Sequence, residues 1–136
     1  MTPAPWVQWL AIAGGGALGA LSRYGVSLLL ARWLGPAFPF GTLAVNGVGS
    51  FVLGLVVALG PLAPGDDDLL GPTARALAGT GFCGAFTTFS TFSVETMRMP
   101  PGLAATNVGA NLALSLVAAS TGLALGRSLS AGLGGS

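Results

Sequence analysis

Four long apolar stretches constrain what this chain can fold into. They lie at about residues 6–34, 41–59, 73–97 and 103–125. A helix that crosses a membrane needs roughly 20 mainly apolar residues, and each stretch is close to this length or exceeds it. Only 7% of the 136 residues are charged, against about a quarter in an average soluble domain. The sequence therefore predicts an all-α membrane protein with four transmembrane helices, forming one domain over residues 1–136.

The stretches between these helices carry turn and loop residues. "GPAFPF" separates the first two helices, "GPLAPGDDDLLGP" the second and third, and "MRMPPG" the third and fourth. Proline and glycine at this density end helices. The last eleven residues, "GRSLSAGLGGS", are small and polar, so we expect a frayed tail after the fourth helix.

The residue types that are missing exclude several functions. The chain has no histidine and a single cysteine, Cys83. A His/Cys metal site, a disulfide framework and a Ser-His-Asp hydrolase are therefore unavailable within one chain. All five basic residues are arginines, and the net charge is +1, so no polybasic surface for nucleic acid is expected. The sequence predicts that the protein is not an enzyme.

The arginines near the ends of the helices are evenly divided between the two sides. With four helices, Arg32 and Arg98 lie on one side and Arg75 and Arg127 on the other. An excess of arginine and lysine normally sets the cytoplasmic side. Because the count is two against two, the sequence leaves two outcomes open: one weakly favoured orientation, or insertion in both orientations.

Uncharged polar residues recur at every fourth position in two of the helices, which places them on one face. They are Thr42, Asn46 and Ser50 in the second helix, and Asn107, Asn111 and Ser115 in the fourth. Such residues often only join neighbouring helices. Together, however, they provide many hydrogen-bond donors with almost no fixed charge, which suits a pathway for a small anion.

The third stretch holds the segment "GFCGAFTTFSTFS", residues 81–93. Its glycines and threonines disfavour a continuous helix, so we expect a break near Gly84 to Thr88. Broken backbone at membrane depth is tolerated only where it is buried in protein or faces water, and it offers free N–H and C=O groups to an ion. The residues alone thus predict a donor-rich helical bundle that handles a small ion.

Four segments resemble the Fluc (CrcB) fluoride-channel family: "GGGALGALSRY", "GTLAVNGVGSFVLG", "GTGFCGAFTTFSTFSVE" and "NLALSL". The resemblance covers most of the chain. It implies a fluoride-selective channel in the bacterial inner membrane, which exports fluoride from the cytoplasm by passive electrodiffusion and lowers its toxicity. It also implies an antiparallel, dual-topology homodimer with two pores.

The resemblance also implies roles for particular residues. The fluoride pore is expected to include Phe89, Phe92, Asn46, Ser115, Thr91 and Asn111. Arg23 is expected at the vestibule. A structural sodium ion on the dimer axis is expected to bind the backbone carbonyls of Gly84 and Thr87. Many members of the family have tyrosine at the position of Asn111, so its part in the pore is open.

Two alternatives differ from a fluoride channel in measurable ways. A small multidrug-type, proton-coupled transporter also has four helices, but it carries a carboxylate within the first helix, where this chain has only Arg23 as an internal charge. A subunit that only assembles with others would pass no ion in liposomes.

Overall fold

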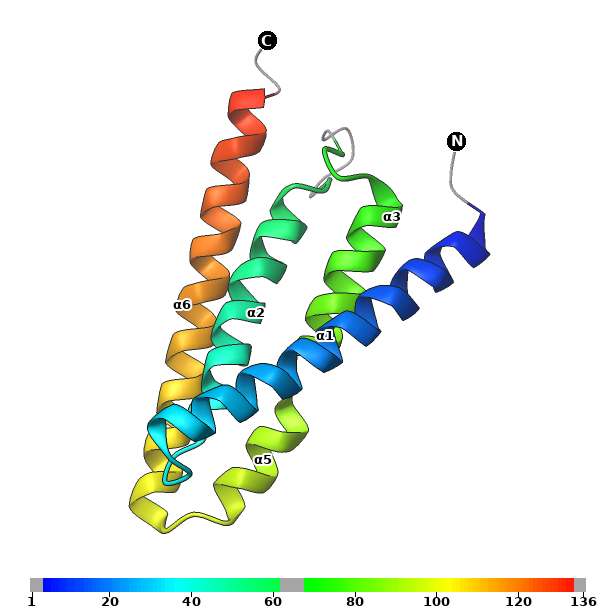
Figure 1. Ribbon diagram of the computed structural model, residues 1–136. Helices are drawn as coiled ribbons and strands as arrows, with labels where there is room; N and C mark the ends of the chain where they lie inside the picture. The colour runs from blue at the N-terminus through cyan, green and yellow to red at the C-terminus, as the bar shows by residue number, and fades with distance from the viewer. Residues whose placement is uncertain (1–3, 62–67, 134–136) are drawn as a thin grey trace.

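The computed structural model describes residues 4–61 and 68–133 as a bundle of helices, and this part of the chain contains no strand (Figure 1). The helices are α1 (Pro5–Leu34), α2 (Phe40–Ala58), α3 (Gly71–Arg75), the π-helix η1 (Ala76–Cys83), α4 (Gly84–Phe86), α5 (Phe89–Met97) and α6 (Pro101–Leu133). The segments α3, η1, α4 and α5 follow one another and together form the third predicted helix. The expected acidic run of the second loop falls mostly on residues 62–67, outside the described ranges.

The predicted helix boundaries agree with the structure to within two residues, except at the end of the fourth helix. The expectation of a frayed tail after residue 125 is wrong, because α6 continues to Leu133. This extension packs against the end of α2: the Ser130 hydroxyl donates to the Ala58 carbonyl at 3.2 Å. It therefore satisfies one of the carbonyls that the end of α2 leaves without a partner.

Length and composition alone mark α2 and α6 as candidate membrane spans among the described residues. The third segment does not pass this test, because it is divided into pieces of at most nine residues. The 30-residue α1 contains Arg23 and Arg32, and a helix of this length extends about 45 Å. A count of four membrane crossings thus remains a prediction.

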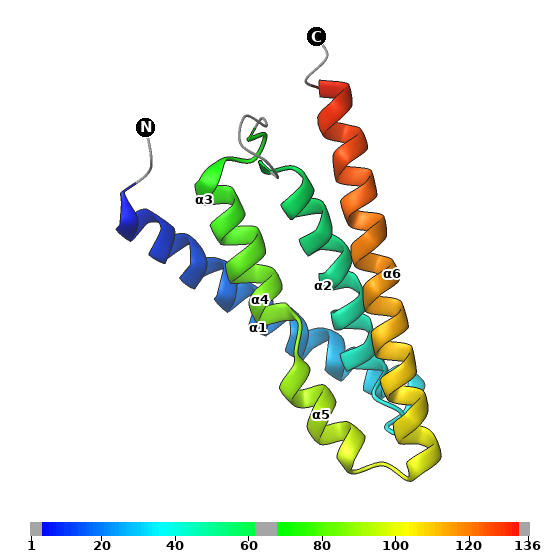
Figure 2. The same cartoon turned by 180° about the vertical axis from the view of Figure 1, so that it is seen from behind.

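The bundle has two layers that cross each other. Helices α2 and α6 lie side by side, whereas α1 runs diagonally and packs against η1 and α4 (Figures 1 and 2). The start of α1 and the end of α6 lie at the same end of the bundle (Figure 1).

The contact between α1 and η1 brings the two backbones together. An added Cβ at Gly15 would collide with the Leu77 carbonyl oxygen, and one at Gly19 with the Phe82 carbonyl oxygen. Small residues spaced four apart allow such close packing of helices in membranes. Because α1 is held this closely, Arg23, one turn beyond Gly19, is carried to the level of the break in the third segment.

We expect Gly15→Ala to destabilise the protein and Gly14→Ala to have no such effect. Alanine at position 15 would overlap the Leu77 backbone, whereas nothing lies within 4 Å of a Cβ at Gly14. Overpacking costs about 1–3 kcal/mol, and a glycine-to-alanine change in a helix otherwise gains roughly 0.5–1 kcal/mol. Thermal unfolding of the two variants in detergent measures the difference. Equal melting temperatures would contradict the predicted backbone contact.

Candidate functional site

The third segment is broken at two threonines, within the interval predicted from the sequence. Thr87 (φ −79°, ψ 158°) and Thr88 (φ −153°, ψ 116°) are extended and separate α4 from α5 (Figure 2). The Thr88 hydroxyl oxygen accepts from the Thr91 N–H at 3.2 Å and so caps the first turn of α5. Threonine is favoured at this N-cap position because its side chain accepts from one of the free N–H groups at the start of a helix.

Asn46 on α2 pairs with both backbone polar groups of Thr88. The Thr88 N–H donates to Asn46 Oδ1 at 2.8 Å, and Asn46 Nδ2 donates to the Thr88 carbonyl at 3.3 Å. Thr88 is only 7% exposed, so water has little access to these groups. One amide side chain thus pairs with both backbone polar groups of Thr88.

The amide contacts continue from Asn46 across to α6 and α5. Asn46 Nδ2 donates to Asn111 Oδ1 at 3.0 Å, and Asn111 Nδ2 donates to Asn107 Oδ1 at 2.9 Å. Asn107 Nδ2 then donates to the Thr96 hydroxyl oxygen at 2.8 Å. The polar stripes of the second and fourth helices therefore face each other. Thr96 was not identified from the sequence as a site residue, and Asn107 only as a member of its stripe.

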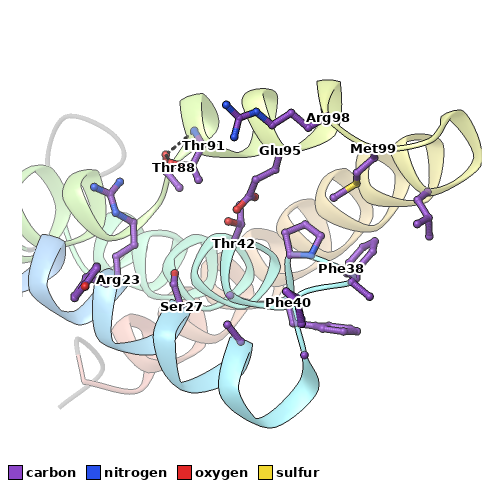
Figure 3. Close-up of a pocket in the computed structure, with 18 of the residues that line it drawn as sticks. Arg23, Ser27, Phe38, Phe40, Thr42, Thr88, Thr91, Glu95, Arg98 and Met99 are labelled. Carbon is purple, nitrogen blue, oxygen red and sulfur yellow. Dashed lines mark hydrogen bonds between the residues drawn. The ribbon is translucent and has the colours of Figure 1, made fainter.

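A cavity of about 690 Å³ lies beside the break, between α1, α5 and the connections that follow them (Figure 3). Its polar wall is formed by Arg23, Ser27, Thr42, Thr88, Thr91, Glu95 and Arg98. Its outer wall is largely apolar and includes Phe38, Phe40, Met99 and Leu103. The cavity extends from the broken helix toward the end of the bundle.

Two charged side chains from different helices point into this cavity, as Figure 3 shows. Arg23 on α1 reaches toward the break, with Nη1 at 3.5 Å from the Thr87 carbonyl oxygen. Glu95 on α5 has a buried carboxylate oxygen, Oε2, that has no hydrogen-bond partner among the described residues. Both residues lie on the cavity wall.

The expected pore residues divide into three groups. In the first group, Asn46 bonds directly to Asn111 and is linked to Thr91 through Thr88. Phe92 is buried, at 8% exposure, and its ring centroid lies 5.6 Å from that of Phe89, which is 76% exposed.

Ser115 forms the third group by itself. It lies one turn beyond Asn111 on α6 and is half-buried, and its hydroxyl has no hydrogen-bond partner among the described residues. It does not line the cavity. Among the expected residues, only Arg23 and Thr91 lie on the cavity wall itself.

The break also provides carbonyl groups that suit a hard cation. In a continuous helix the Thr88 N–H would donate to the Gly84 carbonyl, but here it donates to Asn46. Gly84 is exposed, and an added Cβ would meet only the Gly79 carbonyl oxygen, at 3.9 Å. The Thr87 carbonyl has the long contact with Arg23. Neutral carbonyl oxygens are typical ligands for hard cations, although two from one chain are too few to complete a shell.

The described residues contain no group of three or more His, Cys, Asp and Glu side chains that could hold a metal ion. A cation at the break would therefore depend on backbone oxygens.

The apolar helices, the broken third segment and the polar cavity beside it are those of a helical membrane protein, over the residues that the structure describes. The family model of CrcB-like proteins, described as Camphor Resistance (CrcB), matches residues 10–126. A relative from Shewanella amazonensis is 43% identical over 120 residues, which cover 88% of this chain and 93% of the relative. A relative from Sorangium cellulosum is 43% identical over 131 residues, 92% of this chain and 98% of the relative.

The chain belongs to the CrcB-like protein family. Both relatives are named "Fluoride-specific ion channel FluC". The family is one of ion channels, so the prediction that the protein is not an enzyme is confirmed.

We expect Asn46→Asp to impair ion flux while preserving the shape of the side chain. The carboxylate can still accept from the Thr88 N–H, but it cannot donate to the Thr88 carbonyl or to Asn111 Oδ1. Two acceptors lose their donor, each at a cost of about 1–3 kcal/mol, and the new negative charge repels anions, so a loss of flux of about tenfold or more is expected. Anion efflux from liposomes containing the variant measures this effect. Full flux in Asn46→Asp would mean that its amide is not needed at the break.

Proposed function

We propose that this protein is a fluoride-selective ion channel that lets fluoride leave the bacterial cytoplasm by passive electrodiffusion across the inner membrane, and so lowers fluoride toxicity. Its membership of a family whose relatives are named fluoride-specific ion channels carries this proposal. The broken helix beside a polar cavity supports it, because threonine hydroxyls on the cavity wall offer hydrogen-bond donors to an anion.

Fluoride binds as a compact anion, so the pathway must offer hydrogen-bond donors that replace its hydration. Both Nδ2 hydrogens of Asn46 are engaged within the subunit. The Thr91 hydroxyl accepts from Thr88 at 3.0 Å and keeps its own hydrogen on the cavity wall. We therefore propose Thr91 as the first donor that fluoride meets, with Arg23 on the opposite wall attracting anions into the vestibule.

Beyond Thr91, the proposed pore includes Asn46, Asn111 and Ser115 together with the rings of Phe89 and Phe92. Aromatic ring edges carry a weak positive potential and can face an anion without trapping it. Phe89 is 76% exposed in the single subunit, which supports a pore that is completed by a second copy of the chain.

We propose that the second copy is antiparallel to the first, giving a dual-topology homodimer of two four-helix subunits with two pores. The balanced arginine count supports insertion in both orientations. A tag at the C-terminus would then be accessible from both faces of the membrane, whereas accessibility from one face alone would contradict the proposal.

A structural sodium ion at the break is part of the proposal. The Gly84 and Thr87 carbonyls would hold it, and the same two groups of an antiparallel partner would complete four ligands. The ion would neutralise carbonyl dipoles where the two breaks meet. Dimer dissociation on replacing sodium with N-methylglucamine would support this role, and an unaffected dimer would exclude it.

A small multidrug-type, proton-coupled transporter is the weaker candidate. Such a function requires a titratable group in the transport path, and α1 contains no carboxylate. Glu95 lies on the cavity wall, but it sits near the end of α5. Drug-driven proton movement in liposomes would favour this candidate.

The proposed function predicts that purified protein in liposomes passes fluoride and not chloride. Vesicles loaded with either salt are treated with valinomycin to carry potassium, and anion efflux is followed with ion-selective electrodes. We expect complete fluoride release and chloride release at the level of protein-free vesicles. Comparable release of chloride would refute fluoride selectivity, and no release of either ion would refute the channel.

The proposed pore predicts that Phe89→Ile and Phe92→Ile lower fluoride flux strongly while the protein stays folded. Isoleucine has no positive ring edge, yet apolar swaps of similar volume typically cost under about 1.5 kcal/mol of stability. Phe82→Ile is the matched control, because Phe82 stacks on Phe86 on the other side of the break, with centroids 5.3 Å apart. Equal, small losses for all three variants would place the pathway elsewhere.

A further inference from the structure

The hydrogen bonds around the break form a chain with one direction. The Thr88 N–H donates to Asn46, Asn46 donates to Asn111, and Asn111 donates to Asn107. Asn107 donates to Thr96, and the Thr96 hydroxyl donates to the Phe92 carbonyl at 2.7 Å. Each side chain between the Thr88 N–H and the Phe92 carbonyl accepts from the group before it and donates to the next. Bonds aligned head to tail polarise and strengthen one another.

The chain leaves the start of α5, crosses α2 and α6, and returns to α5. Its first group, the N–H of the N-cap residue Thr88, lies at the start of α5, and its last group, the Phe92 carbonyl, lies one turn into the same helix. The backbone of α5 between Phe92 and Thr88 closes this path. We call the closed path the polar ring; it consists of Thr88, Asn46, Asn111, Asn107, Thr96 and Phe92.

The polar ring matters because α5 has little apolar packing. Of its nine residues only Phe92 is buried. Val94 is 53% exposed and Met97 is 85% exposed. Within the subunit, α5 is therefore held largely by hydrogen bonds at its two ends. These bonds also fix the positions of Phe89 and Phe92.

The orientation of every amide in the polar ring is set by groups that cannot reverse their role. A peptide N–H only donates, and a peptide carbonyl only accepts. The Thr88 N–H thus directs Asn46, and the Phe92 carbonyl directs the Thr96 hydroxyl. The Asn107 carbonyl, which accepts from Asn111 Nδ2 at 3.1 Å, directs Asn111.

We infer that Asn107 and Thr96 are positioning residues for the ion pathway. They do not line the cavity. They act by holding Asn111 and Asn46 in position, since backbone groups already set the direction of these two amides, and by anchoring α5 at Phe92. Asn107 is 0% exposed, so no water can replace Thr96 as its partner. The effect of Asn107 and Thr96 on flux rests on the proposed function. Their effect on the positions of the Asn46 and Asn111 side chains does not.

Thr96→Val tests this inference, because valine keeps the shape of threonine and removes the hydroxyl. Thr106→Val is the matched control: the Thr106 hydroxyl also donates to the carbonyl four residues earlier, at 3.0 Å, but it is exposed and outside the polar ring. Thr96→Ser restores the hydroxyl and should restore what valine removes. Thr96→Ala provides a second removal of the hydroxyl if the valine variant is not recovered as folded protein.

Two readouts separate the inference from the proposed function. The first is fluoride efflux per folded protein, which we expect Thr96→Val to lower about tenfold, the size typical of one buried hydrogen bond left unmade. The second is the ¹⁵N side-chain amide resonance of Asn46, which does not depend on transport. Thr96→Val should shift it, and Thr96→Ser and Thr106→Val should not.

The outcomes are distinct. A shifted Asn46 resonance with reduced flux in Thr96→Val, both recovered in Thr96→Ser, supports the inference. An unchanged Asn46 resonance, or an equal loss of flux in Thr106→Val, overturns it. If the unmodified protein passes no fluoride, the proposed function fails, and the Asn46 resonance still decides whether Thr96 and Asn107 position the amides.

Discussion

The pairing of one asparagine with one peptide unit is the interaction on which the rest of the site depends. An extended residue within a membrane helix leaves an N–H and a C=O without partners, and each costs several kcal/mol in hydrocarbon. Asn46 satisfies both groups of Thr88. This pairing therefore stabilises the break, together with the Thr88 hydroxyl that caps α5.

The same pairing explains why the protein needs so many buried amides. An asparagine has two donor hydrogens, and one carbonyl of Thr88 occupies only one of them. The second goes to Asn111, which in turn needs Asn107. Asn111 and Asn107 are 4% and 0% exposed, so each has to find its partners within the protein. A single break therefore requires a connected set of polar residues on α2, α5 and α6.

Close backbone contact provides the other half of the arrangement. Gly15 and Gly19 let α1 approach η1 until the backbones touch, and this brings Arg23 to the Thr87 carbonyl and to the cavity. A π-helix such as η1 is uncommon and often lies near functional sites; here it ends three residues before the break. The glycines thus let the helices pack closely, and the asparagine amides pair with the backbone polar groups exposed at the break.

The sequence by itself determined the helical membrane fold, the two polar stripes and the break at the threonines, because apolar length, four-residue spacing and local backbone preference are properties of neighbouring residues. Only the tertiary structure decided which groups the stripes meet. The partners of Asn46 lie 42 and 65 residues away, and no local pattern identifies them. Thr96 resembled the other hydroxyls of its helix until packing placed it beside Asn107.

The extension of α6 depends likewise on contact with the end of α2, which small polar residues alone do not predict. Phe89 and Phe92 are three residues apart in sequence, yet one is exposed and the other buried, because burial is set by the helices that surround α5.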